Sequence, residues 1–175
     1  GDKTMTTVDR IRRNHFFKSL AVAGCFLAAA AAQAEPLPQQ TYLPLETALK
    51  AATVTMKKCI DDGYRVSVAV VDRGGNLLAF VRHPLAGPHT VGSSRGKAFT
   101  AASMGRPTAG LANMIAEKPF LAGLRDMDPR LVILGGGLPI SMDDAILGGI
   151  GVGGAPGGHL DEACAQAGLD ATSEK

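Results

Sequence analysis

Between residues 45 and 62, apolar and polar positions follow the period of an amphipathic helix. Apolar residues recur every three or four positions, which places them on one helix face: Leu45, Leu49, Ala52, Met56 and Cys59. Gly63 ends the pattern, as glycine often does after a last helical turn. Two apolar runs, residues 66–71 and 77–81, then flank turn residues at 72–76 and predict a β-hairpin.

The rest of the pattern predicts an α+β domain. The predicted helices span residues 45–62, 90–104, 108–117 and 160–167, and Gly168 is expected to end the last one. The predicted strands span residues 66–71, 77–81, 131–134, 138–142 and 145–152, with an irregular segment at 119–130. Consecutive short strands joined by tight turns indicate an antiparallel sheet with helices packed on it.

The first 34 residues have the pattern of an export signal. Basic residues precede an apolar stretch at 20–32 that is too short to span a bilayer, and Ala32-Gln33-Ala34 fits a small-x-small cleavage site. We predict cleavage after Ala34 and a periplasmic or secreted protein. The expected organisation is a cleaved signal at 1–34, a flexible lead-in at 35–44, a domain at 45–169 and a tail at 170–175. Residues 1–4 precede Met5 and are either a cloning remnant or part of an upstream start.

The export route stays open. Arg12-Arg13 followed by Phe16-Phe17 is similar to a twin-arginine signal, with one residue too many before the aromatic pair. Cys25 would suit a lipoprotein signal, but only six residues separate it from Lys18. General secretion is the third alternative.

Charge depends on whether the leader is counted. The chain has 18 Lys+Arg and 16 Asp+Glu, for a net charge of +2. Five of the bases and two of the acids lie in residues 1–34, so residues 35–175 carry 13 bases, 14 acids and a net charge of −1. The basic character belongs to the leader, and nothing favours nucleic acid or a membrane surface as a partner. No later apolar run approaches the length of a membrane span.

Two cysteines remain after the leader, Cys59 and Cys164. In an oxidising compartment they could form a disulfide, while the alternative is a pair of buried, inert thiols. No CxxC pair or Cys/His cluster has the spacing of a structural zinc site.

Two glycine-rich segments resemble nucleotide-binding motifs, but neither has all the residues that those motifs require. Residues 149–154 satisfy GxGxxG, but the chain ends before the acidic strand that a dinucleotide fold requires. Ala98 stands where a phosphate-binding loop needs Ser or Thr. We therefore expect these glycines to permit tight turns and close approach of the backbone or of subunits.

Several short motifs occur in an order that resembles a known family. They are Val70-Val71-Asp72-Arg73-Gly74-Gly75-Asn76, Arg82-His83-Pro84, Lys97-Ala98-Phe99-Thr100-Ala101-Ala102, Gly135-Gly136-Gly137-Leu138-Pro139-Ile140, Gly149-Ile150-Gly151-Val152 and Asp161-Glu162. In these the chain resembles the GlcG/HbpS family of heme-binding proteins, which is similar to the C-terminal domain of PduO-type proteins. The resemblance implies a profilin-like fold with a five-stranded antiparallel sheet, and homo-oligomers. Gly153-Gly154 departs from the family's usual Ser-Gly, and Asp143-Asp144 from its Asp-Gly turn.

The residues around position 90 fit a heme site. Heme needs an axial ligand, an apolar slot and usually cations for its propionates. His89 is our first choice as iron ligand, because a predicted helix entrance favours neutral imidazole, and His83 is the second. The slot is expected between the hairpin and Phe99, with three candidate cations: Arg95, Lys97 and Arg106.

Other residues are weaker candidates. Lys97 has small neighbours, which predicts a low, uncrowded surface for a flat ligand. His159 is a third histidine near a helix entrance, and Met104 is expected to pack in the core rather than to bind iron. The alternative for every cation is an ordinary solvated helix face.

The sequence thus predicts an exported, homo-oligomeric protein that binds heme or a related tetrapyrrole for storage, sensing or transfer. No catalytic residue is assigned, since no elbow motif surrounds Ser93 or Ser94 and no carboxylate pair has a spacing for acid–base chemistry. Two alternatives stay open: a small enzyme or accessory subunit acting on an organic acid or corrinoid, and an assembly protein without a ligand.

Overall fold

The computed structural model describes residues 39–173, so the predicted leader, its cleavage site and Cys25 lie outside the described residues. The helices are α1 (Leu45–Asp61), α2 (His89–Met104), α3 (Thr108–Glu117) and α4 (Gly158–Ser173), and a 3-10 helix η1 spans Pro119–Asp126. The strands are β1 (Ser67–Asp72), β2 (Leu77–Arg82), β3 (Gly137–Met142) and β4 (Ala145–Gly153). Among these residues, no helix is both long and apolar enough to cross a membrane.

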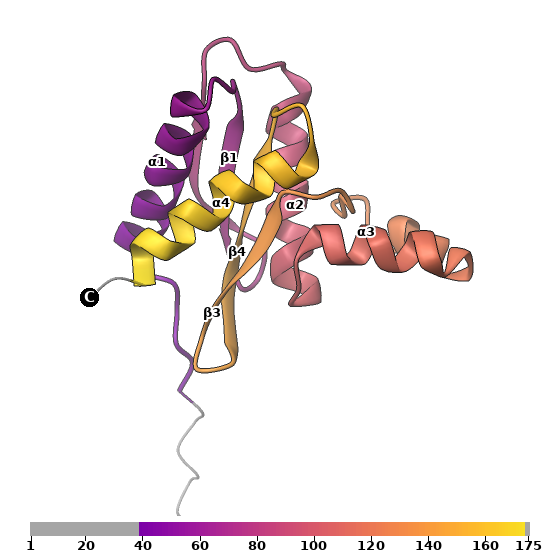
Figure 1. The fold of residues 1–175 in the computed structure, drawn as a ribbon. Coiled ribbons are helices and arrows are strands. Elements are labelled where there is room, and N and C mark those ends of the chain that lie inside the picture. Colours follow the sequence, from indigo (N-terminus) through magenta and orange to yellow (C-terminus); the bar gives the residue numbers. More distant parts are fainter. Residues whose placement is uncertain (1–38, 174–175) are drawn as a thin grey trace, which may run out of the picture. The chain divides into compact units, whose positions relative to one another are not determined.

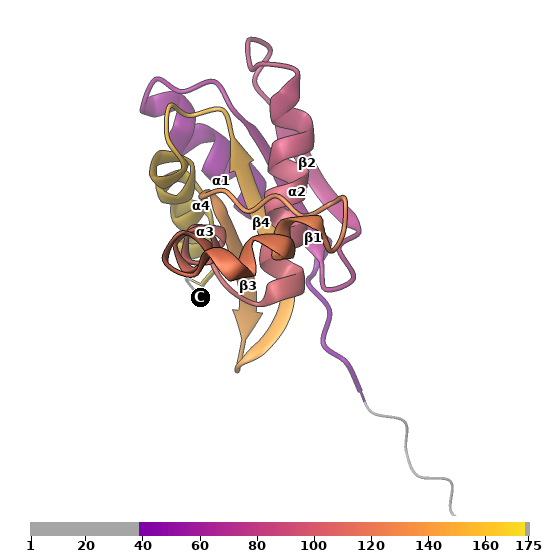
Figure 2. The same cartoon turned by 90° about the vertical axis from the view of Figure 1, so that its right-hand side faces the viewer.

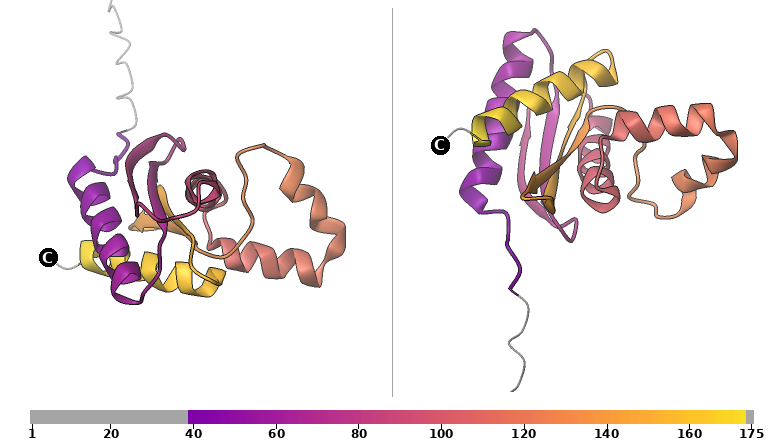
Figure 3. Two further views of the ribbon diagram at one scale, coloured as in Figure 1. Left: turned by 90° about the horizontal axis from the view of Figure 1, so that it is seen from above. Right: turned by 60° about the horizontal axis from the view of Figure 1, so that its bottom comes forward.

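The four strands form one antiparallel sheet in the order β2-β1-β4-β3. Helices α1 and α4 cover one face of the sheet and α2 covers the other (Figures 1 and 3). Successive side chains of β1 point to opposite faces of the sheet, as in any β-strand. Val68 and Val70 pack in the core beneath α1 and α4, whereas Ala69 and Val71 pack against Ala98 of α2.

The predicted fifth strand is wrong. Residues 131–134 are apolar but form a loop between the 3-10 helix and β3. The backbone N–H of Val132 donates to Thr100 Oγ1 at 2.8 Å instead of pairing with a strand, and Ile133 packs beneath α3. The observed class is therefore α+β with four strands. Short apolar runs of this kind do not distinguish a buried strand from a buried loop.

The glycines of β4 allow α2 to lie very close to the sheet. A Cβ atom at Gly149 would overlap the Ala98 carbonyl oxygen, and one at Gly151 would overlap the Ser94 carbonyl oxygen. Close approach of α2 thus explains the first two glycines of the GxGxxG pattern, while Gly154 has φ of +132° and lies against the Arg65 backbone.

Helix α4 continues through Gly168 to Ser173, so the predicted helix end at Gly168 is wrong. Gly168 lies against α1, where any side chain would overlap Thr55 Oγ1, and it serves helix packing instead of capping. Cys59 of α1 and Cys164 of α4 form a buried disulfide with 5.5 Å between their Cα atoms. This decides between the two alternatives that the sequence left open for these cysteines.

Helix α3 and η1 project from the sheet as an arm, residues 108–126, on the side of α2 (Figures 1 and 3). Seen from that side, the arm crosses in front of α2 (Figure 2). A small core of Leu111, Ile115 and Ile133 holds it in place. Phe120 of η1 is 83% exposed.

Candidate functional site

Helix α2 has a buried face and an exposed face. Ser94, Ala98 and Ala101 are buried on the face toward the sheet. His89, Gly92 and Arg95 are exposed and follow one another at three-residue intervals, which places them along one side of the helix. Half-buried Phe99 continues this side, which we call the outer face of α2.

A pocket of about 220 Å³ lies over this outer face. It is bounded by α2, by the β1–β2 hairpin and by the loop at 129–132. Its apolar lining includes Val71, Leu77, Phe99, Pro129 and Val132, and its cations are Arg95 and Arg130. The pocket therefore lies between Phe99 and the face of the hairpin that carries Val71, which is the opposite face from Val68.

Two close contacts hold the pocket walls together. Gly75 has φ of +79°, and any Cβ there would overlap the Phe99 ring, so the turn glycine lets hairpin and helix meet. On the other wall, a Cβ at Gly96 would overlap the Val132 side chain. Asp72 stabilises the turn by accepting a hydrogen bond from the Asn76 backbone N–H at 2.8 Å. Desolvation opposes ionisation of this carboxyl, but the hydrogen bonds from Asn76 and the turn amides outweigh it and lower the pKa of Asp72.

Arg130 lines the pocket beside Phe99. Its guanidinium carbon lies 4.0 Å from the centroid of the Phe99 ring, which is a cation–π arrangement. Two of its nitrogens donate to Asp128, at 3.0 and 2.7 Å. These hydrogen bonds lower the pKa of Asp128 to about 2 and raise that of Arg130. By contrast, Arg95 forms no ion pair with any residue in the described range 39–173.

The two candidate iron ligands differ in their surroundings. His89 begins α2, and its ring lies against Gly87, where any side chain would displace it. Within residues 39–173, no hydrogen bond engages its imidazole nitrogens. His83 Nδ1 accepts a hydrogen bond from the Leu85 backbone N–H at 3.1 Å, so one of its two ring nitrogens is already engaged. His89 is therefore the more available nitrogen ligand.

Lys97 does not lie on the uncrowded surface that the sequence predicted. It is only 5% exposed, and its Nζ donates to Asp161 Oδ2 and to the Val152 carbonyl oxygen, both at 2.8 Å. Asp161 Oδ1 also accepts the Ala155 backbone N–H at 3.0 Å. Burial raises the pKa of Asp161, although the Lys97 ammonium opposes this. The pair joins α2, β4 and α4 below the surface, away from the outer face.

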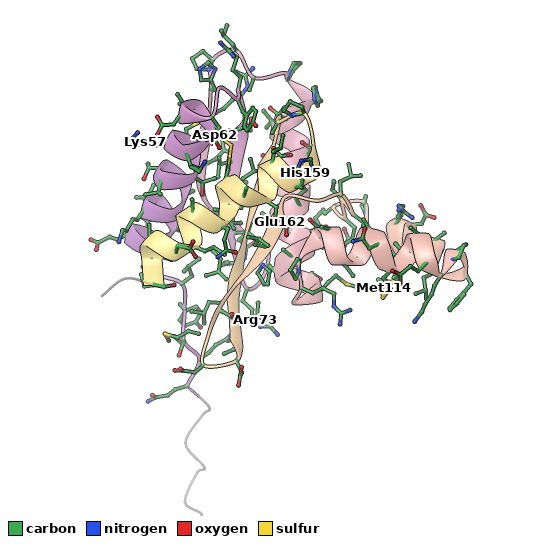
Figure 4. All side chains as sticks on the ribbon, in the orientation of Figure 1. Lys57, Asp62, Arg73, Met114, His159 and Glu162 are labelled. Atoms are coloured by element: carbon green, nitrogen blue, oxygen red, sulfur yellow. A yellow bond between two sulfur atoms is a disulfide. The ribbon has the colours of Figure 1, made fainter. Side chains whose placement is uncertain are left out.

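The remaining candidates lie apart from the pocket. Arg106 is exposed just beyond the end of α2, and half-buried Met104 packs in the core beneath the arm, as expected. His159 lies in the first turn of α4, where its ring rests against Gly157 (Figure 4). No group of three or more His, Cys, Asp or Glu side chains between residues 39 and 173 could hold a metal ion.

Sequence reasoning missed Arg130, which lines the pocket, and Asp161, which is the buried partner of Lys97. Arg130 follows an irregular segment, and its contact with Phe99 depends on how the loop folds back. Asp161 lies 64 residues from Lys97, and no local pattern connects them. The one available signal is the presence of Lys97 between small apolar residues, which is also compatible with burial.

Comparison with known proteins decides the family. A family model described as "Haem degrading protein HbpS-like" matches residues 43–170. The chain belongs to the HbpS-like family. This confirms the resemblance to GlcG/HbpS proteins.

Individual HbpS-like relatives agree with this assignment. The crystal structure of a double mutant of Streptomyces reticuli HbpS superposes on this chain with a TM-score of 0.73. The two sequences are 46% identical, and the match covers 80% of this chain and 93% of that one. Protein GlcG of Escherichia coli K12 is 37% identical over 93 residues, which are 52% of this chain and 66% of that protein. The crystal structure of a PduOC:heme complex has the same fold, with a TM-score of 0.66. The two sequences are 23% identical, and the match covers 75% of this chain and 95% of that one.

The outer face of α2 has the donors that heme requires. It combines an imidazole, an aromatic wall and an arginine without an acidic partner in residues 39–173. The pocket volume of 220 Å³ is below the roughly 300–1,000 Å³ typical of sites that enclose a drug-sized ligand. A pocket of this volume is too small to enclose a tetrapyrrole.

Proposed function

We propose that this protein binds heme or a related tetrapyrrole along the outer face of α2, with His89 as the iron ligand. The observation that carries the proposal is the alignment of His89, Arg95 and Phe99 on one side of a single helix, beside an apolar pocket. Phe99 lies ten positions after His89, which corresponds to about 15 Å along the helix axis. Family membership supports the same ligand class.

Each residue has a distinct part in this proposal. His89 offers a nitrogen without a competing hydrogen bond in the described chain, and Arg95 offers a cation for a carboxylate. Phe99 and Leu77 offer apolar surface that excludes water from one side of the ligand. Heme itself would supply a redox-active iron whose properties depend on the axial ligand and the polarity around it. Storage, sensing or transfer of heme follows from reversible ligation.

Hemin titration of the purified protein tests the proposal. We expect a Soret band that saturates with added hemin, and at least tenfold weaker binding for His89→Ala, because removing the proposed axial nitrogen leaves apolar contact and charge pairing. His83→Ala is the matched control and should bind as the wild type does, since its ring is engaged by Leu85. Equal binding by both variants would contradict the assignment of His89.

The proposal includes assembly of several copies. Its support is Phe120 of the arm, whose aromatic side chain is 83% exposed, and a pocket too small to enclose a tetrapyrrole. Light scattering should give a mass several times that of one chain, and Phe120→Ser should reduce it. Ile60→Ser, on α1 across the sheet, is the control and should leave the mass unchanged. A monomeric wild type would refute the assembly.

We also propose that the protein is exported and works in the periplasm or outside the cell. The leader pattern of residues 1–34 supports this. The buried disulfide between Cys59 and Cys164 supports it independently, because disulfides persist in oxidising compartments and are rare in the cytosol.

A further inference from the structure

We propose that the pocket between Phe99, Leu77 and Val132 is a binding site for a small monocarboxylic acid with a flat apolar body. Arg95 would pair with the carboxylate, and the apolar body would lie against the Phe99 ring. The site is complete without His89, so this proposal does not rest on heme binding.

The size and lining of the pocket point to a small ligand. Its volume of about 220 Å³ suits a single ring or a short branched chain, not a macrocycle. Phe99 presents an aromatic face, while Val71, Leu77 and Val132 add apolar surface to the lining of this partly open pocket. Sites of this kind bind through apolar contact and take their specificity from a few polar groups.

The charges around the pocket select the sign of the ligand. No acidic side chain lines it, whereas two arginines do. The guanidinium of Arg130 is already paired with Asp128 and stacked on Phe99, so it acts chiefly as a wall. Arg95 is exposed and has no acidic partner within residues 39–173. Because Arg95 is the one pocket arginine without an acidic partner in these residues, we expect the ligand to carry a single carboxylate. Arginine binds carboxylates through paired N–H donors.

The walls are held in place before any ligand arrives. Asp72 and Asn76 order the hairpin turn, and the hydrogen bond from Val132 to Thr100 fixes the loop against α2. A preformed pocket loses little conformational entropy on binding, so a small acid can be held with few contacts.

Titration with benzoate, followed by the backbone amide signals of Gly75, Gly92 and Gly96 in NMR spectra, tests the site in the absence of heme. We expect saturable shifts with benzoate and at least tenfold weaker binding of benzamide, which has the same shape without the charge. Arg95→Gln should weaken benzoate binding about ten- to a hundredfold and leave benzamide unaffected, because the lost interaction is a charge-assisted hydrogen bond. Arg106→Gln, an exposed arginine outside the pocket, is the matched control.

A second pair of variants tests the location. Gly92 lines the pocket and a Cβ there meets no atom within 4 Å, so Gly92→Leu should fold normally and fill the cavity. Gly110 on α3 has equally open surroundings and lies outside the pocket, which makes Gly110→Leu the control. Loss of benzoate binding in Gly92→Leu alone supports the site. Equal affinity for benzoate and benzamide, no shifts with either, or unchanged binding in Gly92→Leu would each overturn it.

The two proposals fail separately. His89→Ala should leave benzoate binding unchanged, and a protein without a Soret band on hemin addition could still bind benzoate in this pocket. Loss of benzoate binding in His89→Ala would contradict a site that is independent of heme.

Discussion

Replacing Lys97 with methionine is expected to lower the free energy of unfolding by about 3–5 kcal/mol. Methionine keeps much of the side-chain length but leaves the Asp161 carboxylate buried without a cation, and it removes the donor to the Val152 carbonyl oxygen. An uncompensated buried charge is among the most costly changes in a protein core. Urea or guanidinium denaturation followed by circular dichroism measures the loss.

The pH dependence of this loss has a defined sign. Burial raises the pKa of Asp161 in the folded protein, and removing Lys97 takes away the group that opposes the shift. A carboxyl whose pKa is raised by folding stabilises the protein at low pH and loses that contribution as the pH rises through its folded pKa. The penalty of Lys97→Met should therefore be smaller at pH 4 than at pH 7.

Two further variants serve as controls for Lys97. Lys57→Met removes a lysine from an ion pair whose side chains are 76% and 56% exposed, and it should change stability by no more than about 0.5 kcal/mol. The double variant Lys97→Met/Asp161→Leu removes both buried charges and should recover part of the lost stability. A penalty for Lys97→Met as small as that for Lys57→Met would show that the pair is not needed.

The sequence predicts correctly those helices and turns whose formation depends on residues close together in the chain. The period of α1 and the hairpin turn at Asp72 are encoded by neighbouring residues, and their limits agree with the structure within a residue or two. Residues 131–134 have an equally apolar sequence, but their backbone partner is Thr100 of α2. Gly168 is of the residue type that often ends a helix, but it packs against Thr55 of α1, which is distant in the sequence. These errors share one cause, a contact between segments that are far apart along the chain.

The same distinction applies to the site. His89, Arg95 and Phe99 could be placed together because helical spacing puts them on one side of α2. Lys97 belongs to the same helix but to its buried side, and the choice between the two sides depends on the glycines of β4 and on Asp161. The sequence shows that Lys97 is helical, while only the packing of three elements shows that it is buried.

Removal of the disulfide between Cys59 and Cys164 is expected to lower the free energy of unfolding by about 4–5 kcal/mol. The two cysteines are 105 residues apart, so the bond closes a loop that includes most of the domain and restricts the unfolded chain strongly. The double variant Cys59→Ala/Cys164→Ala, compared with the wild type by denaturation under oxidising conditions, measures this contribution.

A reducing agent provides the control for the alanine substitutions. Both cysteines are fully buried between α1 and α4, so a thiol reductant reaches the bond only when these helices separate. The wild type should resist reduction in buffer and lose stability once it has been unfolded, reduced and refolded. The alanine variant should be insensitive to the same treatment. Equal stability of the reduced and oxidised wild type would mean that the packing of α1 against α4 is held by side-chain contacts alone, without a contribution from the covalent bond.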